Sequence, residues 1–136
     1  MGSLKPYIIS EDARAQAEFY TQSLGGEILS LSTHGELMGA QNEFKDKVMH
    51  MCLAVAGGNT FFMADAIEPF TQGSGISLTI DYKTESEAGE AFAKLAVGGH
   101  VKYPIEMQPF GIFYGELTDK YGIMWMITAQ LKSEPS

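Results

Sequence analysis

The first half of this 136-residue sequence places imidazole and carboxylate side chains at spacings that suit metal binding. His34 and Glu36 are two residues apart, so both would point to one face of an extended segment. Zinc takes imidazole nitrogens and carboxylate oxygens as ligands, and His50 would supply a further imidazole. Two hypotheses follow: a metal site formed by these three side chains, or a solvated loop in which the His-x-Glu pair holds no ligand.

A β-hairpin would bring a second imidazole and carboxylate together. The Gly57-Gly58 dipeptide can supply the positive φ angles of a two-residue turn. Counting outward from such a turn pairs Cys52 with Met63 and His50 with Asp65. A carboxylate beside an imidazole raises the basicity of the ring and fixes its tautomer, which suits a general base or an anchor for a ligand. The other interpretation is a hydrogen-bonded pair at the rim of the sheet.

Two units with the element order β-α-β-β-β are predicted to carry these side chains. In the first unit, apolar residues at helical spacing predict a helix that ends at Gly25-Gly26. Its buried stripe would be Ala13, Ala17, Tyr20 and Leu24. Residues 33–48 are polar and irregular, and they predict a loop. In the second unit, Thr84 and Glu87 predict a helix start with a capping box, and its buried stripe would be Ala88, Phe92 and Leu95.

The two units align with each other at fixed offsets, which indicates an internal duplication. An offset of 73 (92 − 19) carries Phe19 onto Phe92, and it also carries Gly25 and Gly26 onto Gly98 and Gly99. The closing hairpins align at an offset of 63 (126 − 63), which equates Met63 with Met126.

The fold class expected from this duplication is α+β. Two tandem βαβββ modules, residues 4–67 and 75–131, would form a cupped mixed β-sheet with outer helices. Each half-sheet has one face without a helix. Pairing the halves would therefore bring two uncovered faces around a common cleft.

Several segments resemble one protein family. The segments are PYIIS…AEFYTQSLGGEI, HGEL, MHMCLAVAGGNTFFMADA and ELTDKYGIMWMI. On these motifs the chain is identified as a member of the vicinal oxygen chelate superfamily, which includes glyoxalase I, extradiol dioxygenases and bleomycin-resistance proteins. Within the superfamily it resembles the PhnB-like group, and the last segment is the most specific match because Asp-Lys-aromatic-Gly and the tryptophan stand in fixed register.

The resemblance implies four metal-chelating positions, on the first and last strands of each module. Sequence register puts them at about Pro6 and Met63 in the first module and at about Gly75 and Met126 in the second. None of these residues offers a side-chain oxygen or imidazole nitrogen, which Mg, Mn and Zn require. We therefore expect the metal site of the superfamily to be lost and no cofactor to be bound.

Strand alternation selects the side chains expected to face the cleft. If Met63 faces it, Phe61 and Asp65 do so too, and His50 joins them across the hairpin. In the second module, Met124 and Met126 would face the cleft with Phe113 and Gly115, while Trp125 and Glu116 would lie on the helix side. The resemblance also retains Glu36. The predicted ligand-binding residues are His50, Asp65, Phe61, Met63, Phe113, Met126 and Glu36, and for any single methionine the alternative is core packing.

Composition restricts the partners. The net charge of −8 lacks the basic face that nucleic acid requires, and no apolar run is long enough to span a membrane. A single cysteine, Cys52, and the absence of a signal-like N-terminus predict a cytoplasmic protein. The superfamily resemblance implies a homodimer.

The function predicted from these observations is metal-independent binding of a small apolar or aromatic molecule, in the manner of a bleomycin-resistance protein. The first alternative is a metal-dependent glyoxalase- or dioxygenase-like enzyme whose metal is displaced to His34, Glu36 and His50. The second is a scaffold protein with a filled cleft. Some PhnB-like proteins carry a demethylubiquinone methyltransferase label, but the sequence has no Gly-rich loop between a strand and a helix that would support methyl transfer.

Overall fold

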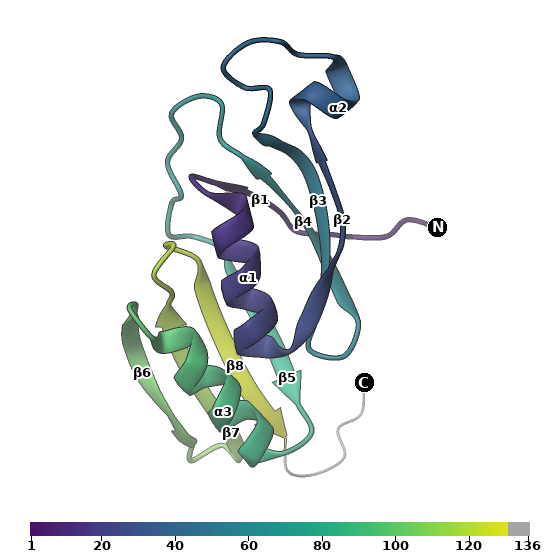
Figure 1. The fold of residues 1–136 in the computed structure, drawn as a ribbon. Helices are drawn as coiled ribbons and strands as arrows, with labels where there is room; N and C mark the ends of the chain where they lie inside the picture. The colour runs from purple at the N-terminus through teal and green to yellow at the C-terminus, as the bar shows by residue number, and fades with distance from the viewer. Residues whose placement is uncertain (131–136) are drawn as a thin grey trace. The chain divides into compact units, whose positions relative to one another are not determined.

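The computed structural model describes residues 1–130 of the chain. Contacts between residues divide the chain into two compact units, Met1–Phe70 (module one) and Thr71–Ser136 (module two). Each contains a four-stranded mixed sheet and a twelve-residue helix that packs on it (Figure 1). The bounds 4–67 and 75–131 remain predictions, and residue 131 lies outside the described residues.

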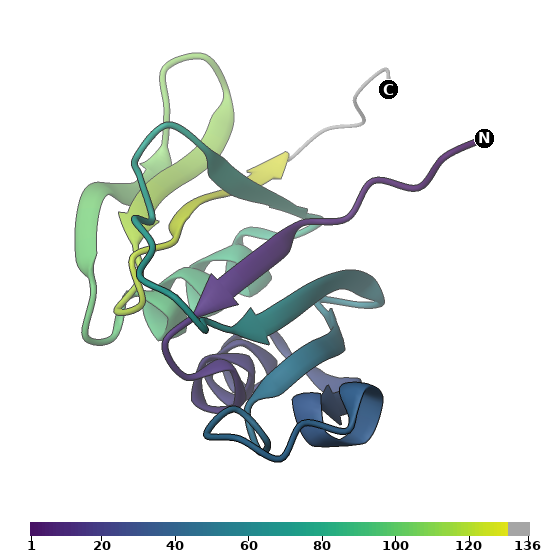
Figure 2. The ribbon, with the colours of Figure 1, turned by 90° about the horizontal axis from the view of Figure 1, so that it is seen from above.

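Module one has a sheet in the order β1-β4-β3-β2. Strand β1 runs parallel to β4, as Figure 2 shows, and the other neighbours are antiparallel. The elements are β1 (Tyr7–Ser10), α1 (Ala13–Leu24), β2 (Gly26–Thr33), α2 (His34–Met38), β3 (Val48–Val55) and β4 (Asn59–Asp65).

Module two repeats this topology with the order β5-β8-β7-β6, and β5 is parallel to β8. The elements are β5 (Ser77–Tyr82), α3 (Glu85–Ala96), β6 (His100–Met107), β7 (Ile112–Thr118) and β8 (Met124–Gln130). The α+β fold class and the tandem βαβββ order are confirmed. Within residues 1–130, no helix combines the length and the apolar character needed to cross a bilayer.

Helix α1 ends where the sequence predicts, at Gly25-Gly26, and it begins after Asp12. The side chain of Asp12 accepts a hydrogen bond from the backbone N–H of Ala15 (3.1 Å), as an N-cap residue does. Gly25 follows the helix with a φ of +73°, which glycine adopts at little cost. The predicted stripe of Ala13, Ala17, Tyr20 and Leu24 is buried.

Helix α3 begins after the predicted N-cap, Thr84, but without the predicted reciprocal capping box. The hydroxyl of Thr84 accepts a hydrogen bond from the backbone N–H of Glu87 (3.1 Å) and donates one to its carboxylate (3.0 Å). The buried residues of the helix are Ala88, Ala91, Phe92 and Leu95, which include the whole predicted stripe.

The segment predicted as a loop over residues 33–48 contains the short helix α2. Thr33 and Glu36 form a capping box: the Thr33 hydroxyl accepts from the N–H of Glu36 (3.1 Å), and the Glu36 carboxylate accepts from the N–H of Thr33 (2.8 Å). The loop prediction was wrong at this point. Thr-x-x-Glu is a capping-box signal for the start of a helix, and here it forms one although the surrounding residues are polar.

The hairpin between β3 and β4 differs from the predicted one in its turn. Three residues, Ala56, Gly57 and Gly58, connect the strands, with φ angles of +50°, +86° and +106°. The side-chain amide of Asn59 donates to the carbonyls of Val55 (3.3 Å) and Ala56 (2.9 Å), which holds this turn. The predicted two-residue turn was therefore wrong.

The longer turn shifts the strand register by one residue. Met51 lies opposite Met63, and Cys52 lies opposite Phe62. The predicted pairing of Cys52 with Met63, and of His50 with Asp65, was wrong for this reason. Because successive side chains point to opposite faces, a shift of one residue changes which side chains share a face.

The hairpin between β7 and β8 is held by a buried carboxylate. Asp119, which is 3% exposed, accepts hydrogen bonds from the N–H groups of Tyr121 (2.8 Å) and Ile123 (3.1 Å). Its other oxygen accepts from the indole N–H of Trp125 (2.8 Å). Asp119 thus links the backbone of the turn to the side chain of Trp125, which lies on the side of the sheet that α3 covers.

Replacing this carboxylate should destabilise the fold strongly. The Asp119→Ala variant leaves three N–H donors without this acceptor, so we expect its free energy of unfolding to fall by about 2–4 kcal/mol. Urea unfolding followed by tryptophan fluorescence measures the change. The exposed Glu106→Ala control should change it by less than about 0.5 kcal/mol, and equal losses in the two variants would contradict the role assigned to Asp119.

Candidate functional site

Phe61, Met63 and Asp65 lie on the face of the first sheet that α1 covers. The ring centroid of Phe61 is 5.9 Å from that of Tyr20 in α1. Met63 follows two positions later on the same face and is 0% exposed. The prediction that these residues face away from the helix was wrong. The prediction that they bind a ligand depended on that orientation, so its basis no longer applies.

Asp65 holds two backbone segments of module one together. Its Oδ1 accepts a hydrogen bond from the N–H of Ala13 at the start of α1 (2.8 Å), and its Oδ2 accepts one from the N–H of Val48 at the start of β3 (2.6 Å). A carboxylate at a helix N-terminus also interacts favourably with the helix dipole. The hydrogen bonds of Asp65 therefore anchor α1 and β3, rather than orienting the His50 imidazole.

The opposite face of the first sheet carries an aromatic cluster of Tyr7, His50 and Phe62. The His50 ring centroid lies 4.8 Å from that of Phe62 and 6.0 Å from that of Tyr7. The Tyr7 and Phe62 rings are also 6.0 Å apart, with an edge-to-face inclination of 63°. The Tyr7 hydroxyl donates to the backbone carbonyl of Met49 (3.2 Å), which fixes its ring. We call this surface the open face of module one.

The open face of module one remains accessible. Tyr7 is 50% exposed and its strand neighbour on the same face, Ile9, is 39% exposed. His50, Phe62 and Cys52 are partly buried. Rings that are fixed by packing yet accessible can stack on a planar ligand, and an imidazole nitrogen can add a hydrogen bond.

In module two, Met124 and Met126 lie on the face of the sheet that points away from α3, as predicted. Phe113 and Gly115, which were predicted on the same face, lie on the side that α3 covers. Met126 lies opposite Glu116, whereas Gly115 lies opposite Ile127, which is fully buried. A Cβ atom on Gly115 would come within 2.8 Å of the Phe92 ring in α3. The choice of face was therefore wrong for Gly115, and for Phe113 two positions before it.

Glu116 was assigned to the wrong face as well, since it lies beside Met126 and not beneath α3. Its carboxylate accepts a hydrogen bond from the hydroxyl of Tyr114 on the same face. A second carboxylate, Asp81, accepts from the hydroxyl of Thr128 (2.7 Å). This second open face thus combines thioethers with carboxylates that are already hydrogen-bonded.

Met63 and Met126 are not equivalent positions. Met63 points toward α1, while Met126 points away from α3. The equivalence predicted from the offset of 63 was wrong, because this odd offset joins a side chain on the helix side of β4 to one on the open face of β8. At the middle of the open faces, the outer and closing strands pair Tyr7 with Phe62 in module one and Thr79 with Met126 in module two.

These positions do not suit the divalent metal of the superfamily. None of the four residues offers a carboxylate or an imidazole, the ligands that such a cation prefers. Across residues 1–130, no three His, Cys, Asp or Glu side chains are grouped to hold a metal ion. His34, Glu36 and His50 are accordingly not gathered into a displaced site.

His34 and Glu36 have local structural contacts in α2. Glu36 completes the capping box with Thr33 through Oε1. The His34 ring lies 6.4 Å from the ring of Phe44 (centroids), and its backbone N–H donates to the carbonyl of Lys47 (3.0 Å). The two residues fix the position of α2 rather than presenting two ligands on one extended face.

Sequence reasoning missed Tyr7 and Phe62, the two rings around His50. Phe61 and Phe62 are adjacent and equally apolar, so composition does not tell which of them faces the helix. The signal that separates them is turn length, which places Phe62 opposite Cys52.

Comparison with known proteins gives a consistent family match. The family model described as 3-demethylubiquinone-9 3-methyltransferase matches residues 5–128. Protein YjdN from Escherichia coli strain K12 is 27% identical over 146 residues, covering 98% of this chain and 98% of YjdN.

Similar solved structures cover nearly the whole chain. The PhnB protein from Bacillus cereus is 29% identical with a TM-score of 0.76, covering 94% of this chain and 99% of its own. Protein PA1353 from Pseudomonas aeruginosa is 28% identical with a TM-score of 0.79, covering 94% and 98%. A glyoxylase/bleomycin resistance protein/dioxygenase domain from Frankia sp. EAN1pec is 13% identical with a TM-score of 0.69, covering 98% and 95%, and shares the fold alone.

The different roles of Asp65 and His50 can be measured. We expect Asp65→Ala to lower the free energy of unfolding by about 2–4 kcal/mol, because two backbone N–H groups lose a charged acceptor. His50→Ala should lower it by less than about 1 kcal/mol, since the ring is partly exposed. Urea unfolding gives both values, with the exposed Glu43→Ala as the control. A loss in His50→Ala as large as that in Asp65→Ala would contradict this assignment.

Proposed function

Since the chain belongs to the PhnB-like family described as 3-demethylubiquinone-9 3-methyltransferase, we propose that it is a small-molecule-binding protein of the glyoxalase/bleomycin-resistance type. The observation that carries this proposal is the aromatic cluster of Tyr7, His50 and Phe62 on the open face of module one. Its ligand is a small molecule with a planar apolar or aromatic part.

The geometry of the cluster supports this ligand class. Aromatic rings prefer contacts with centroids about 4.5–7 Å apart, and the cluster meets this with an edge-to-face pair inclined at 63° and a tilted pair inclined at 49°. His50 supplies the polar atoms beside this apolar surface. The thioethers of Met124 and Met126 offer module two a second adaptable apolar surface.

The connections that open the helices favour binding over methyl transfer. Strand β1 is joined to α1 by Glu11 and Asp12, and β5 is joined to α3 by Lys83 and Thr84. Neither connection contains the glycines that let a backbone approach a nucleotide-like cofactor. Asp12 and Thr84 instead serve as N-caps.

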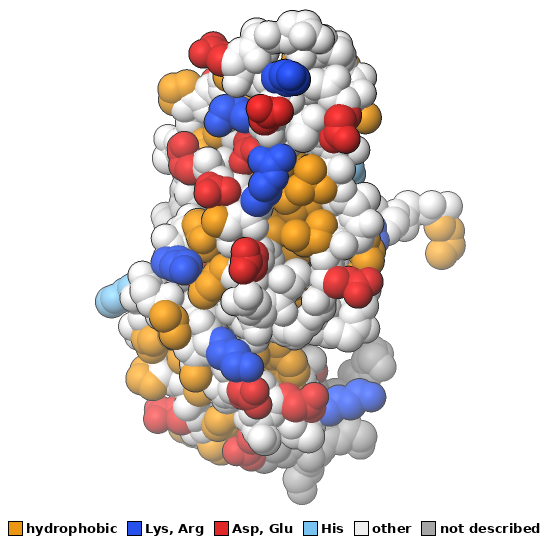
Figure 3. Space-filling view, viewed as in Figure 1, with side chains coloured by type: hydrophobic (Ala, Val, Ile, Leu, Met, Phe, Trp, Pro, Cys, Tyr) orange, Lys and Arg blue, Asp and Glu red, His pale blue; other side chains and the backbone are white. Residues whose placement is uncertain are grey.

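We further propose a cytoplasmic homodimer without a nucleic-acid partner. The free thiol of Cys52 suits a reducing compartment. On the face shown in Figure 3, the Lys and Arg side chains are interspersed with Asp and Glu. A net charge of −8 repels a phosphate backbone.

Two adjacent phenylalanines give a matched test of the ligand face. We expect Phe62→Leu to weaken the binding of indole, a planar probe, by about 3- to 10-fold, because a ring contact is lost. Phe61→Leu should leave indole binding unchanged and lower the free energy of unfolding by about 1 kcal/mol, since Phe61 packs under α1. Ligand-observed NMR titration and urea unfolding give the two readouts.

The reverse pattern, in which Phe61→Leu weakens indole binding and Phe62→Leu does not, would contradict the proposed face. Binding of indole that neither substitution alters would contradict it as well. His50→Ala serves as an independent change on the same surface and should also weaken binding.

Native mass spectrometry tests the metal and the oligomer together. For protein purified from its own host, we expect the mass of two chains with an organic ligand and no stoichiometric metal, because no three His, Cys, Asp or Glu side chains of residues 1–130 are grouped to hold one. Stoichiometric Zn, Ni, Mn or Fe that disappears in His50→Ala would favour the metal-dependent enzyme instead.

A further inference from the structure

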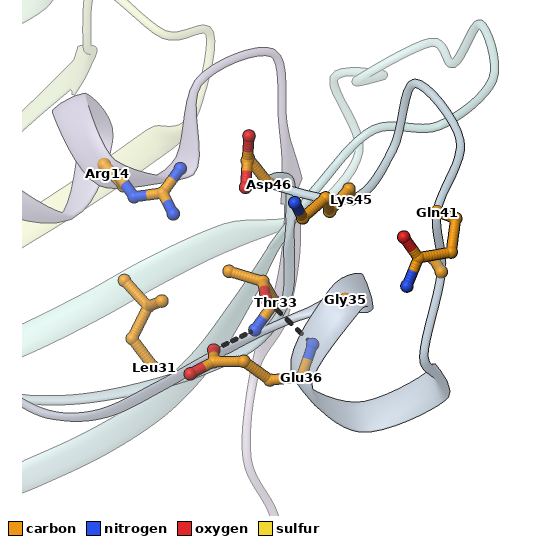
Figure 4. A pocket seen from close by; sticks show the side chains of 9 residues that line it. Arg14, Leu31, Thr33, Gly35, Glu36, Gln41, Lys45 and Asp46 are labelled. Carbon is orange, nitrogen blue, oxygen red and sulfur yellow. Dashed lines mark hydrogen bonds between the residues drawn. The ribbon is translucent and has the colours of Figure 1, made fainter.

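A pocket of about 480 Å³ lies on the α1 side of module one, away from the open face. Its wall includes Leu31 of β2, which lies opposite the fully buried Met51 and thus on the helix side of the sheet. Figure 4 shows the pocket between the start of α1, the end of β2, α2 and residues 40–46. The volume is within the range of small-molecule sites. The lining residues are Arg14, Leu31, Thr33, Gly35, Glu36, Ala40, Gln41, Lys45 and Asp46.

Two cations and two anions face this pocket. Arg14 is the only arginine of the sequence. Figure 4 shows its guanidinium and the ammonium of Lys45 pointing from opposite sides toward the space beside Asp46. Among the contacts of residues 1–130, the side chains of Arg14, Lys45 and Asp46 make no hydrogen bond or ion pair. Glu36 uses only Oε1, for its capping bond.

The wall is held in place by backbone contacts. The N–H of Gly35 donates to the carbonyl of Lys45 (2.9 Å), and that of His34 donates to the carbonyl of Lys47 (3.0 Å). A Cβ atom on Gly35 would lie only 3.0 Å from that Lys45 carbonyl, so the two segments touch. The capping box adds the bond that orients Glu36. Glu36, Lys45 and Asp46 therefore stand on segments that hydrogen bonds already join.

This charge pattern selects one ligand class. An anion alone would meet the carboxylates of Asp46 and Glu36, and a cation alone would meet Arg14 and Lys45. A molecule that carries both charges satisfies all four groups, with its carboxylate on the planar fork of the guanidinium. We propose that this pocket binds a small zwitterion with an ammonium and a carboxylate, the size of a free amino acid or dipeptide. Leu31 and Ala40 provide apolar contacts for its aliphatic part.

Glycylglycine is a suitable zwitterionic probe, with acetate and methylammonium as its separate halves. In ¹H–¹⁵N correlation spectra, we expect glycylglycine to shift the amide signals of Gly35, Ala40 and Lys45 saturably. Acetate and methylammonium should each bind at least about tenfold more weakly. No saturable shift with glycylglycine would overturn the proposal, and so would acetate binding as tightly as glycylglycine.

Charge-neutral variants test the assigned groups. Arg14→Gln and Asp46→Asn should each weaken glycylglycine binding by at least about tenfold. Lys45→Gln is an independent variant on the cationic side, and Lys83→Gln, an exposed cation of module two, is the matched control. Unchanged affinity in both Arg14→Gln and Lys45→Gln would overturn the assignment. Phe62→Leu should leave glycylglycine binding unaltered, because this pocket is independent of the open face.

Discussion

The turn formed by Ala56, Gly57 and Gly58 decides which side chains of module one share a face. All three residues have positive φ angles, and the turn leaves Val55 directly opposite Asn59. Since the side-chain period of a strand is two, a turn with one residue fewer would move every side chain of one strand relative to its partner. The core and the candidate ligand surface therefore depend on the same short segment.

One consequence is the separation of two adjacent phenylalanines. Phe61 packs on Tyr20 beneath α1, while Phe62 packs on His50 on the open face. Asp65, in phase with Phe61, reaches the N-terminus of α1 and stabilises the helix that covers this core. The packed core and the proposed binding surface thus lie on opposite faces of one strand.

Much of the fold could be predicted from the sequence, because helix periodicity and capping are local signals. The stripe of α1, the capping of α3 by Thr84 and the family resemblance were all confirmed. Turn length was not predictable in the same way, since Gly57-Gly58 suits a turn of two or three residues and alanine at Ala56 gives no sign of its positive φ. This one ambiguity explains why the sequence paired His50 with Asp65 and Cys52 with Met63. In module two the buried Trp125 was predicted correctly, because strand alternation places it on the face opposite to that of Met126.

Proton–proton contacts across the hairpin test the register most directly. In a nuclear Overhauser spectrum of labelled protein, we predict contacts between the rings of Phe61 and Tyr20, and between the rings of Phe62 and His50. Contacts that instead join the side chains of His50 and Asp65 across the strands would contradict the register and the open face built on it.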